Sequence, residues 1–127
     1  MASDLVIELD NEPGALARVA TAISDAGVNI AAATCIGTGQ TVELHILVPH
    51  GEPVRHALAI TNTAVSRERE VVVVQAQDRP GELAELANRV AAAGVNIELL
   101  YVATGSRVVF GAEDHQALDD ALNGVSV

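Results

Sequence analysis

The chain has very few of the residues that nucleic-acid-binding, secreted or membrane proteins commonly use. Among its 127 residues, only Tyr101 and Phe110 are aromatic, Cys35 is the single cysteine, and lysine and tryptophan are absent. One cysteine excludes an internal disulfide and is typical of a reducing compartment. No apolar run approaches the roughly 20 residues that a membrane helix needs, and the first residues lack a signal-peptide pattern. We therefore expect a cytoplasmic protein whose core consists of Val, Leu, Ile and Ala.

The charge is strongly one-sided. The chain has seventeen acidic residues and seven arginines, which gives a net charge of -10. An acidic surface aids solubility and repels phosphate backbones and anionic lipid, so neither nucleic acid nor a membrane is expected as a partner. An RNA-binding module would in addition need aromatic platforms and a basic surface, and this sequence supplies neither.

An internal repeat organises the chain. When the sequence is shifted by 67 residues, Pro13-Gly14 falls on Pro80-Gly81, and the tetrapeptide Gly-Val-Asn-Ile at 27–30 falls on its copy at 94–97. Chance matches between alanine-rich stretches do not reproduce two such motifs at one fixed offset. A repeat of this kind indicates two copies of one structural unit.

Each copy is predicted to follow the same plan of alternating elements. β-branched apolar runs predict strands, and apolar residues at helical spacing predict amphipathic helices. The expected strands of the first copy lie at 5–9, 28–36, 41–48 and 64–69, and those of the second at 71–74, 95–103 and 107–112. Second helices are expected at 52–60 and at 115–122, the latter with Asp114 as its N-cap.

The first helix of each copy carries one apolar stripe and ends at a glycine. The stripe is expected to consist of Leu16, Val19, Ala20, Ile23 and Ala26, and in the second copy of Leu83, Leu86, Ala87, Val90 and Ala93. Gly27 and Gly94 follow the stripes, where glycine readily adopts the left-handed conformation that ends a helix.

The order β-α-β-β-α-β predicts an α+β protein of two ferredoxin-like units in tandem, with antiparallel sheets and helices on one face. We place the units at residues 1–66 and 67–127, and the last strand of the second, at Val125–Val127, is expected to be short or absent. Units this small are marginal alone. Four consecutive valines at 71–74 predict that both faces of that strand are buried, by the other unit or by another chain. We therefore expect self-association, with a homodimer as the simplest form.

The first strand-to-helix turn of each copy has the chemistry of an anion site. Gly14 and Gly81 lack side chains, so a ligand can approach the backbone, and the first helical N–H groups have no partner within the helix. The helix dipole adds to their attraction for a carboxylate. Asn11 or Asp78 at the rim can accept hydrogen bonds from an ammonium group. An α-amino acid carries both groups.

A purely structural interpretation of these motifs stays open. Pro-Gly after Asn or Asp is also an ordinary turn and helix start, and Gly-Val-Asn-Ile is also an ordinary helix end. The occurrence of both motifs in both copies, at the same spacing, favours a ligand.

At these motifs the sequence resembles the ACT domain family. The resemblance lies in Asn11-x-Pro13-Gly14-x-Leu16 with the tetrapeptide at 27–30, and in Asp78-x-Pro80-Gly81-x-Leu83 with the tetrapeptide at 94–97. It implies a ferredoxin-like fold and a regulatory, allosteric role in binding amino acids or similar small ligands, at positions in the turn and after the helix. On this chain the implied ligand-binding positions are Asn11, Glu12, Pro13, Gly14, Ala15, Leu16, Asn29, Ile30, Asp78, Arg79, Pro80, Gly81, Glu82, Leu83, Asn96 and Ile97.

No pattern in the chain predicts catalysis. The four histidines lack metal-ligand spacing and are expected to be solvated, and Cys35 is expected to be a buried structural thiol. Gly37-Thr38-Gly39-Gln40 joins two expected strands and is predicted to be a hairpin, not a dinucleotide loop. We therefore expect no catalytic residue, no metal and no cofactor.

The sequence thus predicts a non-catalytic regulatory or sensor protein that binds a small molecule, with an amino acid as the expected ligand. The alternative is a regulatory subunit that docks on a metabolic enzyme, with ligand binding secondary or lost.

Overall fold

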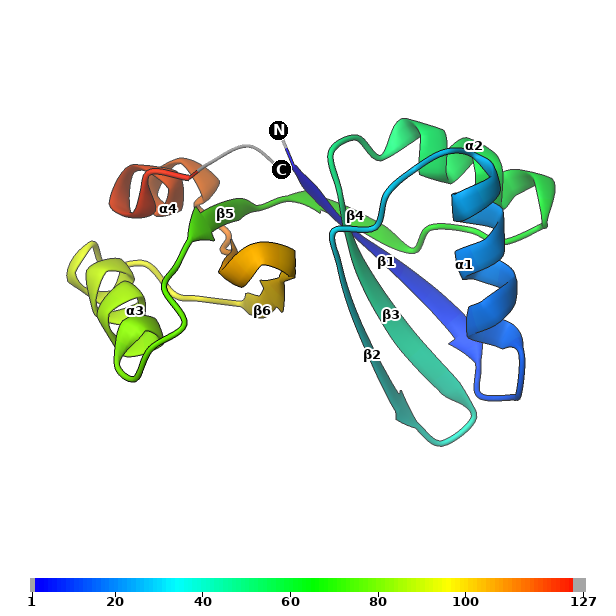
Figure 1. Cartoon of the computed structure of the whole chain (residues 1–127), viewed down its shortest axis with the longest axis horizontal. Coiled ribbons are helices and arrows are strands. Elements are labelled where there is room, and N and C mark those ends of the chain that lie inside the picture. Colours follow the sequence, from blue (N-terminus) through cyan, green and yellow to red (C-terminus); the bar gives the residue numbers. More distant parts are fainter. Residues whose placement is uncertain (1, 125–127) are drawn as a thin grey trace. The chain divides into compact units, whose positions relative to one another are not determined.

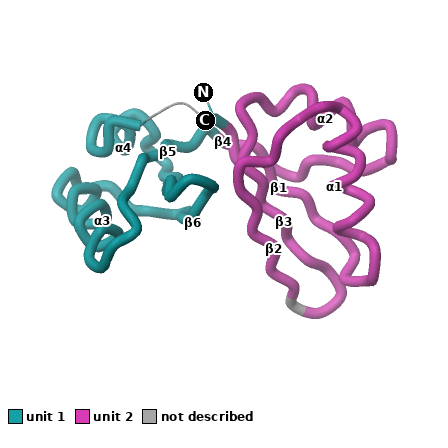
Figure 2. Tube along the Cα trace, viewed as in Figure 1, with its two compact units in different colours: residues 1–2, 70–127 teal, residues 3–69 magenta. Residues whose placement is uncertain are grey.

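A computed structural model describes residues 2–124 of the chain (Figure 1). It divides into two compact units, shown in magenta and teal in Figure 2. We call residues 3–69 the N-terminal unit, and Ala2 with residues 70–124 the C-terminal unit. The domain boundary that the sequence places between residues 66 and 67 stays a prediction. No helix among the described residues has the length and apolar character needed to cross a membrane.

The N-terminal unit is a four-stranded sheet with two helices. Its elements are β1 (Ser3–Asp10), α1 (Ala15–Asp25), β2 (Ala32–Thr38), β3 (Thr41–Val48), α2 (Glu52–Ile60) and β4 (Arg67–Glu70). The strand order is β2-β3-β1-β4, and β3 runs antiparallel to both of its neighbours. Two strand-helix-strand crossovers that interleave in this way give the ferredoxin-like arrangement, which confirms the predicted fold class.

The C-terminal unit repeats the first five elements of this plan. They are β5 (Val72–Gln75), α3 (Glu82–Ala92), β6 (Leu99–Ala103), β7 (Arg107–Gly111) and α4 (His115–Leu122), with a short 3-10 helix η1 (Thr104–Ser106) between β6 and β7. The sheet order β5-β7-β6 matches that of β1, β3 and β2. Asp114 caps α4 as predicted, since its carboxylate accepts a hydrogen bond from Ala117 N–H at 3.0 Å. The expected last strand at Val125–Val127 lies outside the described residues.

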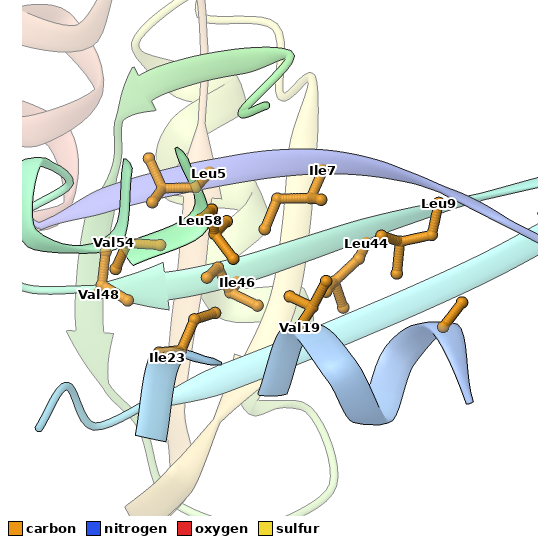
Figure 3. Close-up of a cluster of buried hydrophobic side chains, with 11 residues drawn as sticks. Leu5, Ile7, Leu9, Val19, Ile23, Leu44, Ile46, Val48, Val54 and Leu58 are labelled. Carbon is orange, nitrogen blue, oxygen red and sulfur yellow. The ribbon is translucent and has the colours of Figure 1, made fainter. Parts of the chain in front are cut away.

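One face of the N-terminal sheet packs against both helices of the unit and forms a continuous apolar core with them (Figure 3). Alternate residues of β1 and β3 point toward the helices, because side chains along a strand alternate between its two faces. The labelled core side chains are Leu5, Ile7 and Leu9 of β1, Leu44, Ile46 and Val48 of β3, Val19 and Ile23 of α1, and Val54 and Leu58 of α2. The C-terminal unit has an equivalent core around Phe110.

The predicted apolar stripes are wrong at their ends. Helix α1 buries Ala15, Val19 and Ile23, whereas the side chain of Leu16 is 46% exposed. Leu83 is likewise 49% exposed in α3, and Ala26 and Ala93 are exposed. The reason is the helix phase. Because successive residues turn by about 100°, a helix that directs its first residue at the sheet directs its second one away from it.

The second strand of each unit begins later than predicted. After α1, Gly27 takes a φ of +76° and ends the helix, as the sequence predicts. The following residues are irregular, and the β-ladder starts where Ala31 N–H donates to Leu47 O at 3.0 Å. In this irregular segment the side chains of Val28 and Ile30 pack against the core. The segment therefore does not pair with β3. Asn29 and Asn96 therefore precede the strands instead of beginning them.

Two expectations about strand burial have opposite outcomes. Val71 to Val74 are all buried, at most 6% exposed, as four consecutive valines predict. Cys35, predicted to be a buried thiol, is exposed. It lies opposite Leu44 in the register, on the helix-side face, but β2 is the edge strand and the helices do not cover it there. The predicted hairpin between β2 and β3 is confirmed, and its turn is Gly39-Gln40 because Gly37 and Thr38 already belong to β2.

A polar network crosses the N-terminal sheet on the face opposite its helices. His45 Nδ1 lies 2.9 Å from Asp4 Oδ2, and His45 Nε2 lies 2.8 Å from Glu43 Oε1. Arg67 Nη2 donates to the same Glu43 oxygen at 3.0 Å. Asp4 is only 1% exposed, so its carboxylate needs such a partner. His45 is thus partnered and mostly buried, which corrects the expectation that all four histidines are solvated, and His115 is half-buried as well.

Removal of a core side chain should destabilise the N-terminal unit far more than removal of an exposed one. Ile23→Ala deletes a fully buried side chain and leaves a cavity, so it should lower the free energy of unfolding by about 2–5 kcal/mol. The matched control is Ile60→Ala, because Ile60 is 77% exposed and its loss should change stability by about 0.5 kcal/mol or less. Denaturant unfolding of both variants checks this, and equal losses would contradict the assigned helix phase.

The pKa of Glu43 should report on His45. The hydrogen bond from His45 is the main cause that holds the pKa of Glu43 below its ordinary value of 4.5, and Arg67 contributes less. His45→Ala should therefore raise the pKa of Glu43 more than Arg67→Ala does, as measured by carbon NMR of the carboxyl group. Because the folded pKa is the lower one, the stabilisation from Glu43 is present above about pH 4.5 and is lost as the pH falls through the folded pKa. The reverse order of the two variants would contradict the assignment.

Candidate functional site

The strand-to-helix turns of the two units have the same backbone geometry. Gly14 precedes α1 with φ +87° and ψ -11°, and Gly81 precedes α3 with φ +87° and ψ -10°. A side chain at this φ would be strained, so glycine is required by conformation alone. Pro13 and Pro80 lie in the turn, one residue before this glycine and two residues before the helix begins. The repeated sequence motif is therefore also a repeated structure.

Each turn presents backbone N–H groups at a helix N-terminus. Ala15 N–H donates to Glu12 O at 3.3 Å, and the equivalent Glu82 N–H donates to Arg79 O at 3.3 Å. The acceptors Glu12 and Arg79 lie in the turns, outside the helices, so these two N–H groups are used locally. Between residues 2 and 124, no backbone acceptor pairs with the N–H groups of Gly14 and Leu16, or with those of Gly81 and Leu83. They remain suited to an anion.

Asn11 fixes the first turn against the neighbouring hairpin. Its backbone N–H donates to Gln40 O at 2.8 Å, and its side-chain Nδ2 donates to Gly39 O at 2.9 Å. The amide nitrogen is thus used within the chain, and the side-chain oxygen is the atom suited to accept from an ammonium group. The equivalent Asp78 is exposed and has only acceptor oxygens when ionised.

The predicted residues after the helices play two different parts. Asn29 and Asn96 are exposed, and the structure leaves their side chains at the surface. Ile30 and Ile97 pack against the cores of their units. The structure thus gives Ile30 and Ile97 a role in packing, and their role in ligand binding stays a prediction.

A cavity of about 870 Å³ lies beside α1 in the N-terminal unit. Its wall includes the end of β1, one side of α1 and the segment that follows α2. Carboxylates, hydroxyls and an amide dominate its polar lining, which consists of Glu8, Asp10, Arg18, Thr21, Asp25, Thr61, Asn62, Thr63 and Ser66. Of the sixteen predicted site residues, only Ala15 lines it. The cavity and the first turn meet at Asp10, Ala15 and Arg18.

Arg18 is the functional candidate that the sequence reasoning missed. Its Nη2 lies 3.0 Å from Glu12 Oε1, and its Nη1 approaches Gly14 so closely that a β-carbon there would lie 3.4 Å away. Arg18 is 67% exposed, so this ion pair is weak and can be exchanged for one with a ligand. An arginine one turn after a Pro-Gly motif was the available signal, because residues four apart share a helix face.

In the described part of the chain, no three His, Cys, Asp or Glu side chains come together in a way that could hold a metal ion. The chemistry that the turns offer is hydrogen bonding and charge. The backbone N–H groups of the turns are donors for a carboxylate. The acidic side chains that line the cavity are acceptors for an ammonium group.

A family model matches the first repeat, and several solved structures share the fold of most of the chain. Residues 3–62 match the model of the ACT domain. No curated protein sequence matches significantly. A solved protein of Bacteroides thetaiotaomicron is 25% identical with a TM-score of 0.84, over 95% of this chain and 85% of that one. The ligand-free regulatory subunit of aspartate kinase from Thermus thermophilus is 21% identical with a TM-score of 0.68, over 94% and 89% of the chains. A structure of aspartokinase alpha and beta subunits is 15% identical with a TM-score of 0.63, over 96% and 93%.

Substitution of the turn glycine should destabilise the protein in proportion to the strain it introduces. Gly14→Ala places a β-carbon on a left-handed residue, which should cost about 1–2 kcal/mol of unfolding free energy. Gly14→Asn should cost less, because asparagine tolerates this conformation better than alanine. Thermal unfolding of the two variants checks the order. Equal or reversed losses would contradict the left-handed assignment.

Proposed function

We propose that the protein is a non-catalytic regulatory protein that binds an α-amino acid, and the match of residues 3–62 to the model of the ACT domain supports this proposal. The C-terminal unit repeats both the fold and the turn motif. The observation that carries the proposal is the pair of Pro-Gly turns with the same backbone angles, each opening a helix whose N–H groups at the glycine and the leucine have no backbone acceptor among the described residues.

The ligand chemistry follows from the groups around the first turn. The carboxylate would accept from Gly14 and Leu16 N–H and from the Arg18 guanidinium, which favours a planar, bidentate anion. The ammonium group would donate to acidic or amide oxygens at the mouth of the cavity, of which Asp10 is the one next to the turn. The ligand's side chain would extend along the cavity beside α1. A site of this kind selects the α-amino acid class and leaves room for varied side chains.

Binding would be transmitted through α1, because the same helix forms one wall of the site and buries Val19 and Ile23 in the core. A ligand that fixes the start of α1 would stabilise the whole N-terminal unit. Such a change is what a regulatory protein can pass to a partner or to a second copy of itself.

A second candidate function is that of a subunit that regulates an enzyme. The observation that favours it is the fold shared with the regulatory subunit of aspartate kinase from Thermus thermophilus over 94% of this chain. Purification from native extract separates the two: a stoichiometric enzyme partner supports the subunit, and a homodimer without a partner supports a free-standing sensor.

The test of the proposed function is a thermal-shift screen against the twenty protein amino acids. A ligand present at 100 times its dissociation constant should add about 2.7 kcal/mol of stability, which moves the midpoint by several degrees in a protein of this size. Arg18→Ala should remove most of the shift. Arg107→Ala is the matched control, because Arg107 bonds only within its own hairpin, to Thr104, and should leave the shift unchanged. Absence of a shift with every amino acid would overturn the proposal.

A further inference from the structure

Three residues on one face of α1 leave the N-terminal site open. Ala15, Arg18 and Ala22 follow one another at spacings of three and four, so they share a helix face, and all three line the 870 Å³ cavity. Two of them end at a β-carbon and occupy little of the space. The third carries the only positive charge in the cavity lining.

The equivalent face of α3 carries three long charged side chains. At the repeat distance of 67 residues, Glu82 replaces Ala15, Glu85 replaces Arg18 and Arg89 replaces Ala22. The backbone of the turn is the same in both units, so the difference between the two sites lies in these side chains.

Glu82 folds back over its own turn. Its Oε2 accepts a hydrogen bond from Gln77 N–H at 2.7 Å and lies 3.6 Å from Arg79 Nε, and its side chain is only 15% exposed. A carboxylate of the protein is therefore already held where the strand ends and the turn begins. At the corresponding position of the first turn, Ala15 offers no such group.

The ion pair beside the turn is reversed between the two units. In the N-terminal unit Glu12 precedes the turn glycine and Arg18 follows it, 3.0 Å apart. In the C-terminal unit Arg79 precedes the glycine and Glu85 follows it, 3.2 Å apart. The first turn of α1 thus contains no acidic residue, whereas that of α3 contains Glu82 and Glu85. These two carboxylates satisfy the helix dipole of α3 and repel an incoming anion.

Arg89 links α3 to the end of α4. Its Nη2 donates to Leu122 O at 3.1 Å, at the end of α4. The equivalent Ala22 has no side chain that reaches the segment after α2, and the N-terminal cavity extends into that space. The C-terminal unit thus fills with its own arginine the region that the N-terminal unit leaves open.

We infer that ligand binding is confined to the N-terminal repeat, and that the Glu82, Glu85 and Arg89 side chains take the place of a ligand in the C-terminal repeat. This inference rests on the proposed function and names which of the two turns performs it. The C-terminal repeat then serves as a structural copy whose site is permanently closed by the chain itself.

The test is a nitrogen–proton NMR spectrum of the full chain with and without a saturating mixture of the twenty protein amino acids. We expect the amide signals of Gly14 and Leu16 to shift and those of Gly81 and Leu83 to stay in place. Ala15→Glu, which copies the C-terminal residue into the first turn, should abolish the shifts. Ser24→Glu is the control for charge, because it adds the same charge to α1 at an exposed position outside the cavity lining. Ala15 is only 6% exposed, so the dispersion of the amide signals must show that the Ala15→Glu variant is folded.

The reverse transplantation tests the cause. Glu82→Ala combined with Glu85→Arg, Arg79→Glu and Arg89→Ala gives the second unit the residue types that the first unit carries at these four positions. The amides of Gly81 and Leu83 should then respond to the mixture. Shifts of both turns in the unmodified protein, or of the second turn alone, would overturn the inference while the proposed function stands. No shift at any amide would overturn both, and the wild-type spectrum gives this answer even if the quadruple variant does not fold.

Discussion

The left-handed glycine between the first strand and the first helix of each unit is the constraint on which the rest depends. At φ +87°, Gly14 and Gly81 turn the chain sharply enough for the helix to begin at the very next residue. The starting point sets the phase of the helix, and the phase decides that Ala15 faces the sheet while Leu16 faces solvent. It also leaves N–H groups directed into the turn. The core and the candidate site are therefore two consequences of one backbone angle.

Two copies of the same backbone have diverged through the charges on one helix face. The N-terminal unit places small residues and one arginine beside its turn, and the C-terminal unit places Glu82 and Glu85 there. Their contacts are internal, since Glu82 holds a backbone N–H of its own turn. Such contacts also stabilise the helix start, because acidic residues in a first turn complement the dipole.

The polar network on the opposite face of the N-terminal sheet follows a similar logic. Asp4 is buried and ionisable, and it is tolerated because His45 pairs with it. His45 in turn contacts Glu43, which contacts Arg67. The buried carboxylate of Asp4 is thus the first member of a network of four side chains. Nothing in the spacing of these four residues along the sequence predicts their meeting. The register of β1 against β3 and the position of β4 beside β1 bring them together.

The sequence alone determined the fold class, the order of the elements and the turn motif, because these depend on local patterns: period-two and helical spacing, Pro-Gly turns, and a repeat at 67 residues. It predicted the ranges of β3, α2 and α4 and the Asp114 cap correctly. It failed where the outcome depends on neighbours far along the chain. Cys35 is exposed because its strand lies at the sheet edge, Leu16 is exposed because of the helix phase, and Arg18 became a candidate only through its position over Gly14. Exposure, phase and proximity are properties of packed elements, so only the tertiary structure could decide them.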